Sequence, residues 1–303
     1  MLVGVIGLGI MGSAMAGNLL KSGYRVVGYD VVVARRSEHR RAGGLVAANA
    51  AAVARRADIV ICSLPSAVAL DAVASDLATT RRRELIVVET STLPLAAKQS
   101  ACERLAAAGI TLLDCPLSGT GSQAKVKDIV VYASGPRKAY ERVAPVMEAF
   151  ARGHYYVGPF GAGSKTKFVA NLLVAIHNVA AAEALVLAMK AGLDPALTLK
   201  VIADGGGSSR MLQVRGPMMV RGDYSDVTMK LDVWQKDMTV IADFARSVGC
   251  PTPLFAMTAP MYLAAMAGGR ATEDTGAVCA VLEAMAGIDR RLPAQKRKRA
   301  PQS

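Results

Sequence analysis

Residues 2–12 read LVGVIGLGIMG, and this stretch decides the fold. The run Leu2–Ile6 has the length and apolar character of a buried strand, and it leads directly into a G-x-G-x-x-G turn. A second strand candidate follows and ends at Asp30. A glycine turn alone is a weak signal, but strand, turn, helix and a second strand with an acidic end together predict a dinucleotide-binding βαβ unit. The glycines are Gly7, Gly9 and Gly12.

Each glycine of this turn has a separate physical task. Gly7 permits the tight turn, Gly9 lets the backbone approach a pyrophosphate, and Gly12 lets the helix pack closely on the strand. The helix expected to start at Met11 offers free N–H groups and a partial positive charge to phosphates. Asp30 can accept hydrogen bonds from ribose hydroxyls and would repel a 2′-phosphate, which favours NAD over NADP.

Two arginines favour the other cofactor. Arg35 and Arg36 follow Asp30 closely, and a nearby arginine can neutralise the 2′-phosphate of NADP. The acid at the strand end and the valines at 31–33 still favour NAD, so we expect NAD, with NADP less favoured.

The first half of the chain continues the same alternation. Short β-branched runs alternate with alanine-rich segments of helical period, which predicts an α/β fold with a doubly wound, Rossmann-type parallel sheet. We expect strands at Leu2–Ile6, Arg25–Asp30, Asp58–Leu64, Glu84–Glu89, Ile110–Asp114 and Ile129–Ser134.

The second half has a different pattern. From Gly163 to Lys190 the sequence predicts one long interdomain helix of about 40 Å, apolar on nearly all sides. Further helical patterns follow around 195–203, 208–220, 232–248, 253–267 and 273–287, with no convincing strand. We therefore expect a Rossmann domain over 1–160, an all-α domain over 161–289 that begins with the long helix, and a tail over 290–303.

The composition argues against several classes of protein, namely disordered, membrane-spanning, secreted and metal-binding ones. Hydrophobic residues make up 52% of the 303 residues and charged residues 20%, so the chain is not disordered. We expect no membrane-spanning segment and no signal peptide, and a cytoplasmic location. The 5 cysteines and 3 histidines have no metal-site spacing, so no metal is expected.

The basic excess gathers partly at the end of the chain. The net charge is +12, and residues 290–299 read RRLPAQKRKR. We interpret this segment as a solvated, mobile tail. An electrostatic arm for nucleic acid is the alternative, and we expect no nucleic-acid partner.

Two further segments carry chemistry. The loop Asp114–Gly121 follows a strand and reads DCPLSGTG, so its hydroxyls and N–H groups suit a carboxylate, although an ordinary turn has the same composition. Lys167 and Asn171 lie four residues apart and share one face of the long helix. Burial would lower the pKa of Lys167 and make it a proton donor or acceptor, whereas Lys165 faces elsewhere.

Taken together, these blocks resemble the β-hydroxyacid dehydrogenase family, over nearly the whole chain to about residue 288. The glycine turn and Asp30 match the family's first motif, and G-x-G-x-x-x-K-x-x-x-N matches Gly161 through Asn171. The other matching blocks are Leu64-Pro65, Ser91-Thr92, Asp114 through Gly119, and Lys236-Asp237.

The resemblance implies an NAD(P)-dependent 3-hydroxyacid dehydrogenase. It implies that Lys167 is the catalytic acid/base, that Ser118 and Gly119 hold the substrate carboxylate, and that Asn171 positions the reacting oxygen. Leu64, Pro65, Thr92 and Lys236 would lie on the cofactor side. The expected partner is a small carboxylate, with the chain assembled as a homodimer or homotetramer.

The chain also departs from the family pattern. The run after Gly119 lacks the usual second glycine, and Ala170 replaces the first asparagine of a doublet, so the particular hydroxy acid stays open. An imine reductase of the same fold and a non-catalytic binding protein of dehydrogenase fold are the alternatives. Both usually lack the lysine that stands here at 167.

Overall fold

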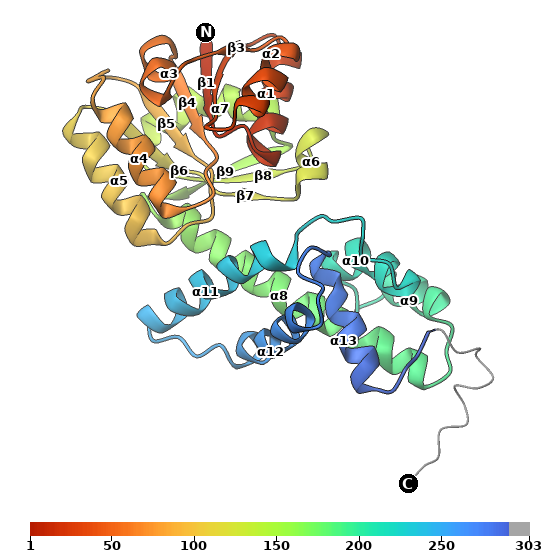
Figure 1. Cartoon of the computed structure of the whole chain (residues 1–303). Helices are drawn as coiled ribbons and strands as arrows, with labels where there is room; N and C mark the ends of the chain where they lie inside the picture. Colours follow the sequence, from red (N-terminus) through yellow and green to blue (C-terminus); the bar gives the residue numbers. More distant parts are fainter. Residues whose placement is uncertain (291–303) are drawn as a thin grey trace. The chain divides into compact units, whose positions relative to one another are not determined.

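The nine strands of the first unit form one sheet, in which β1, the strand before the glycine turn, lies between β2 and β4 (Figure 1). A computed structural model describes residues 1–290 of the 303. The sheet has the order β3-β2-β1-β4-β5-β6-β8-β7, and β9 also pairs with β8. The strands are β1 (Leu2–Ile6), β2 (Arg25–Tyr29), β3 (Leu45–Val46), β4 (Ile59–Cys62), β5 (Ile86–Glu89), β6 (Thr111–Asp114), β7 (Leu117–Ser118), β8 (Val130–Ser134) and β9 (Gly153–Gly158).

Two layers of helices cover this sheet because successive strand residues point to opposite faces. In β4, Ile59 and Ile61 belong to the core under α1 and α7, whereas Val60 and Cys62 belong to the core under α3, α4 and α5. The helices are α1 (Ile10–Lys21), α2 (Val33–Arg41), α3 (Ala50–Arg56), α4 (Ala67–Ala78), α5 (Leu95–Ala107), α6 (Gly121–Lys125) and α7 (Arg137–Phe150). The predicted doubly wound α/β fold is confirmed.

The expectation of a parallel sheet holds from β1 to β6 and fails at β8 and β9, which run in the opposite direction. β1 to β6 pair in parallel, but β8 runs antiparallel to β6, with Asp114 opposite Ser134. A parallel return needs a crossover helix over the sheet. Between β6 and β8 the chain instead forms β7 and the five-residue α6, which packs on α1 through a 2.7 Å hydrogen bond from Asn18 Nδ2 to the Ala124 carbonyl.

The remaining described elements are helical. They are α8 (Ala162–Lys190), α9 (Pro195–Ala203), α10 (Arg210–Arg221), α11 (Leu231–Ser247), α12 (Pro253–Ala267), a 3₁₀ turn (Thr275–Ala277) and α13 (Val278–Met285). Up to residue 290 the only strand-like feature here is a single bridge between Lys230 and Asp274. The all-α second part agrees with the sequence prediction.

The boundary between the two compact units falls inside α8. The first unit ends at Phe168 and the second begins at Val169, whereas the sequence pattern places the domain boundary at residue 160, before the helix. The first turns of α8, with Lys167, therefore belong to the Rossmann unit.

Helix α8 is also the one described helix that is long and apolar enough to cross a membrane. By length and composition alone, α8 therefore does not meet the expectation that no segment of the chain could span a membrane. A core helix passes the same test, and α8 has fully buried residues such as Ala182 and Leu185 as well as buried polar ones, among them Asn178.

The end of the described chain is tied to the second unit. Arg290 Nε lies 2.9 Å from Glu283 Oε1, and Arg290 Nη1 donates a 2.7 Å hydrogen bond to the carbonyl of Val220 in the last turn of α10. Arg290, which the sequence assigns to the tail, thus contacts the helical body. The rest of the predicted tail, 291–303, lies outside the described residues.

Candidate active site

The glycine turn between β1 and α1 has the close approaches that the motif predicts. Gly7 has φ +87°, and a Cβ there would lie 2.1 Å from the Ser63 carbonyl oxygen. A Cβ on Gly12 would lie 1.8 Å from the Gly7 carbonyl oxygen, so neither position accepts a side chain. At Gly9, the N-cap of α1, the nearest atom to an added Cβ is Arg35 Nη1 at 3.8 Å, and no side chain caps the helix. These features fit a dinucleotide pyrophosphate at the start of α1, beside Met11.

Asp30 at the end of β2 is buried and already bound to the backbone around it. Its carboxylate accepts 2.8 Å hydrogen bonds from the N–H groups of Leu8 and Val32. Arg35 Nη1 lies 3.4 Å from Asp30 Oδ2, while Arg36 lies over the ring of Tyr29 at 5.7 Å. Asp30 therefore holds the glycine turn through Leu8, and of the arginine pair Arg35 is the one that contacts Asp30.

The loops after β4 and β5 are joined to one another. The Leu64 N–H donates a 2.7 Å hydrogen bond to Ser91 Oγ, and the Ser91 N–H donates to Glu89 Oε1 at 2.9 Å. Leu64, Pro65 and Thr92, which the resemblance assigns to the cofactor side, thus stand on two connected loops. Both loops lie at the carboxyl edge of the sheet, where ligands of doubly wound folds bind.

The predicted substrate loop contains a strand end and a helix cap. Ser118 ends β7, and Gly119 follows with φ +133°. Thr120 caps α6 through a reciprocal pair of hydrogen bonds with Gln123, so the residues that depart from the family pattern build a helix start. A Cβ on Gly121 would lie 2.2 Å from Ile10 Cγ2, which places this loop against the glycine turn.

Lys167 lies in the first turns of α8 and is 8% exposed, whereas Lys165 is exposed to solvent. The helix start is fixed to the end of β6, because Asp114 Oδ2 accepts from the Ser164 N–H at 2.7 Å and Asp114 Oδ1 accepts from Ser164 Oγ at 2.8 Å. A Cβ on Gly163 would lie 2.4 Å from the Tyr132 carbonyl oxygen, so glycine permits this contact. The structure confirms that Lys167 is the buried lysine of the pair.

In the second unit, Asn171 is held by α11. Asn171 is 4% exposed, and its Nδ2 donates a 2.9 Å hydrogen bond to Asp237 Oδ2. Lys236 Nζ lies 3.6 Å from Asp237 Oδ1. Sequence reasoning assigned a role to Lys236 but none to Asp237. The available signal was its place on the buried face of α11, which also carries Trp234 and Ile241.

Sequence reasoning also missed a buried charge cluster in the first unit. Lys98 of α5 lies 2.7 Å from Glu89 Oε2 and 2.8 Å from Asp114 Oδ1, and all three side chains are fully buried. Burial lowers the pKa of Lys98, but Glu89 and Asp114 more than offset this and raise it above its usual value. The signal was the position of two acids at the ends of apolar strands.

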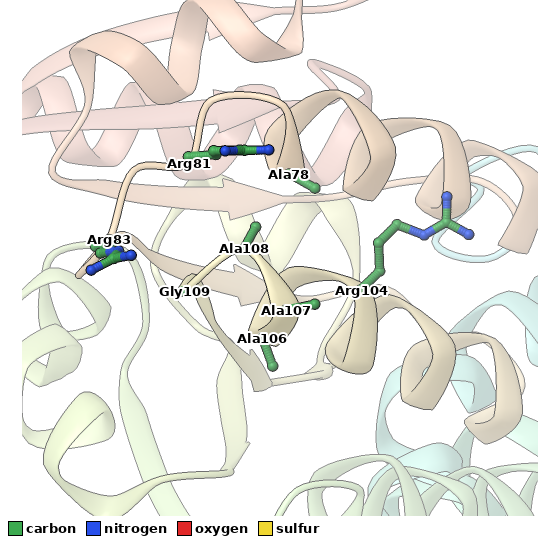
Figure 2. Close-up of a pocket in the computed structure, with 8 residues that line it drawn as sticks. All are labelled: Ala78, Arg81, Arg83, Arg104, Ala106, Ala107, Ala108 and Gly109. Carbon is green, nitrogen blue, oxygen red and sulfur yellow. The ribbon is translucent and has the colours of Figure 1, made fainter.

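An arginine-lined hollow lies at the other edge of the sheet (Figure 2). It has a volume of about 730 Å³ and includes Arg81 and Arg83 from the loop before β5 and Arg104 from α5. Arg104 pairs with Asp71 at 2.9 Å. The hollow is at the amino ends of β5 and β6, so it has no part in the site above. Across residues 1–290, no three His, Cys, Asp or Glu side chains are grouped to hold a metal.

Comparison with known proteins identifies the family of the chain. Residues 2–158 match the family model for the NAD-binding domain of 6-phosphogluconate dehydrogenase. Residues 161–282 match the model described as the NAD-binding domain of NADP-dependent 3-hydroxyisobutyrate dehydrogenase. The first model thus covers most of the first unit, and the second covers α8 and most of the helices after it.

Individual relatives span nearly the whole chain. L-threonate dehydrogenase of Cupriavidus necator is 34% identical over 91% of this chain and 94% of its own length. The crystal structure of 3-hydroxyisobutyrate dehydrogenase from Salmonella typhimurium is 31% identical, with TM-score 0.82 over 93% of this chain and 99% of that one. The 3-hydroxyisobutyrate dehydrogenase of Mycobacterium tuberculosis, solved with L-serine, is 26% identical, with TM-score 0.85 over 93% and 98%. The chain is therefore an NAD(P)-dependent hydroxyacid dehydrogenase and belongs to the β-hydroxyacid dehydrogenase family.

Proposed function

We propose that this enzyme transfers a hydride between NAD and a small 3-hydroxy acid, with Lys167 as general acid/base. One observation carries the proposal: Lys167 is a buried lysine on a helix start bound to Asp114, at the same sheet edge as the glycine turn and Ser118. A buried amine at a ligand-binding edge is suited to take and return a proton near neutral pH.

The residues divide the work as follows. Ser118 and the backbone at Gly119 hold the substrate carboxylate, and Asn171, oriented by Asp237, positions the reacting oxygen. Lys167 takes the hydroxyl proton during oxidation and returns it to the alkoxide in the reverse direction. The nicotinamide of the cofactor, when bound, accepts or donates the hydride. The glycine turn, Leu64, Pro65, Thr92 and Lys236 hold that cofactor.

We propose NAD as the preferred cofactor. The Asp30 carboxylate stands at the end of β2 with the Leu8 and Val32 N–H groups bound to it, so it stays in place against a ribose and opposes a 2′-phosphate. Arg35 is the residue that could reverse this preference, because its guanidinium lies between Asp30 and Gly9.

A substrate panel tests the proposed function. NADH formation is measured with L-threonate, 3-hydroxyisobutyrate and 2-(hydroxymethyl)glutarate, which are substrates named in the relatives, and NADH consumption with a cyclic imine. We expect turnover with at least one acid and none with the imine. Turnover of the imine alone would favour the imine reductase, and NADH binding without any turnover would favour a non-catalytic protein.

We also propose a cytoplasmic enzyme that forms a homodimer or homotetramer. Helices α9 and α12 expose large apolar side chains, among them Leu197, Val201, Leu254 and Met257, each at least 60% exposed. Exposed apolar groups at this density are typical of association surfaces. Light scattering of the purified chain would show one subunit mass if this proposal fails.

A further inference from the structure

The buried cluster of Glu89, Lys98 and Asp114 combines two carboxylates with one ammonium and has no exposed atoms on its side chains. Such a group costs free energy to bury, and it is tolerated only when every charge has close partners. Apolar side chains of similar volume often stabilise a fold equally well, so stability alone is a weak reason for charges at this place. The groups to which Asp114 and Glu89 are hydrogen-bonded say more about the role of the cluster.

Asp114 connects the cluster to the start of α8. Its two carboxylate oxygens accept from Ser164 N at 2.7 Å and from Ser164 Oγ at 2.8 Å. Ser134 Oγ donates to the Asp114 carbonyl at 3.0 Å and accepts from the Gly163 N–H at 2.9 Å, which makes a second connection to the same turn. The partial positive charge of the helix start offsets the excess negative charge of the cluster. Lys167 follows Ser164 by three residues, so its backbone lies one turn further on.

Glu89 connects the cluster to the loops on the cofactor side. Its Oε1 accepts from the Ser91 N–H at 2.9 Å, and Ser91 Oγ accepts from the Leu64 N–H at 2.7 Å. Thr92 follows Ser91 directly. Lys98 lies between the two carboxylates and joins the two sets of contacts.

We propose that the Glu89–Lys98–Asp114 cluster positions the groups that take part in the reaction. It fixes the start of α8, with Lys167, and the Thr92 loop relative to each other. This inference rests on the proposed role of Lys167. None of the three is a catalytic residue here, because Asp114 acts through Ser164, Glu89 acts through Ser91, and Lys98 joins these two carboxylates. The cluster works by keeping the acid/base on its path to the substrate, where a displacement of about 1 Å can cost about a hundredfold in rate.

Two variants of different severity test the proposal. Asp114→Asn keeps the shape but removes a charge, and Ser164→Ala removes one hydrogen bond while its N–H remains. We expect kcat with NAD and L-threonate, or the panel acid with the highest turnover, to fall about ten- to a hundredfold for Asp114→Asn. For Ser164→Ala we expect a fall of about two- to tenfold. For Ser164→Ala, KM for NAD should change little, because the Ser164 side chain bonds to Asp114 and not to the glycine turn or the Thr92 loop.

The matched control is Val143→Ala in α7, a fully buried apolar residue in the core of the same unit. It should lower the melting temperature while leaving kcat and its pH profile unchanged. The cluster variants should instead shift the pH profile, because a displaced Lys167 has a different environment. If Asp114→Asn does not fold, Ser164→Ala decides alone.

A second measurement, which does not depend on turnover, tests whether Ser164 affects the environment of Lys167. The lysines are reductively dimethylated with ¹³C-formaldehyde and a borohydride reductant, and the Lys167 methyl signal, assigned by its loss in Lys167→Met, is titrated by NMR. We expect its pKa to differ between Ser164→Ala and the unaltered enzyme and to be unchanged in Val143→Ala. An equal pKa in all three, with kcat preserved, would overturn the proposal and leave the cluster a purely structural group.

Lys167→Met separates this inference from the proposed function. If that change leaves kcat intact, the acid/base assignment fails, whatever the cluster does. If it cripples the enzyme while the cluster variants change only the melting temperature, the assignment stands and the positioning role fails. In the double variant Lys167→Met with Ser164→Ala, the second change should have no further effect on kcat, because the group it positions is gone.

Discussion

At the scale of single residues, the decisive comparison is between two lysines on one helix. Lys167 is buried and Lys165 is exposed, although they are only two positions apart. Losing a positioned proton-transfer group costs about 10²–10⁴-fold in rate, so Lys167→Met should lower kcat by at least about a hundredfold while NADH still binds. Lys167→Arg should also fail, because arginine keeps its proton. Lys165→Met is the control. A crippled Lys165→Met beside an active Lys167→Met would reverse the assignment.

A second prediction at this scale concerns the cofactor. Asp30→Asn removes the charge that opposes a 2′-phosphate and keeps one acceptor oxygen, so one of the two N–H groups of Leu8 and Val32 loses its hydrogen bond. We expect kcat/KM for NAD to fall and the ratio of NAD to NADP efficiency to drop about tenfold, the equivalent of about 1.4 kcal/mol. Arg35→Ala should move the ratio in the opposite direction. A wild-type enzyme that prefers NADP would show that Arg35 outweighs Asp30.

At the scale of elements, the β7–α6 loop is the place where substrate binding can be tested. Ser118 ends β7 beside Gly119, and the residues after it are committed to capping α6. Ser118→Ala should raise KM for the acid about tenfold, the cost of a hydrogen bond to a charged group, with KM for NAD unchanged. Ser122→Ala, at an exposed position in the first turn of α6, is the control. An unchanged KM for the acid would make Ser118 an ordinary turn residue.

Elements with strong local patterns were predictable from the sequence. The glycine turn, α8 and the helices from α9 to α12 follow periodicity and end signals that each segment carries within itself. The antiparallel direction of β8 was not predictable, because the residues of a strand do not indicate its direction, and α6 before it is bound to α1 by a contact 106 residues apart in the chain. Two-residue β3 and β7 are too short for any pattern to indicate them.

In the candidate site, too, local patterns were predictable from the sequence and contacts between distant segments were not. Lys167 and Asn171 share a helical face and could be paired from spacing alone. The partners that hold them could not, because Asp237 comes from α11 and Asp114 from β6, which are 66 and 50 residues away along the chain from the groups they bind. Buried charges of this kind have no periodic signal, and only the fold brings them together.

At the scale of the whole molecule, Arg290 fastens the end of the described chain to α10 and α13. Arg290 satisfies Glu283 and the Val220 carbonyl at the end of α10. Arg290→Ala leaves a nearly buried carboxylate without its partner and should cost the second unit about 1–3 kcal/mol of unfolding free energy, measured by denaturant melts. Removal of residues 291–303 is the control and should leave activity and melting temperature nearly intact. A large loss on that truncation would refute the expectation that the tail is dispensable.

Helix α8 crosses the boundary between the units without a glycine or proline from Ser164 to Lys190. The spacing of Lys167 and Asn171 is therefore set by the backbone hydrogen bonds of one turn. Each residue of an α-helix turns the chain by about 100° around the helix axis. One extra residue between Lys167 and Asn171 would therefore rotate Asn171 and the rest of α8 by about 100° relative to Lys167. Changes in the length of this segment are thus far more disruptive than changes in its composition, because they shift every later residue out of phase with Lys167.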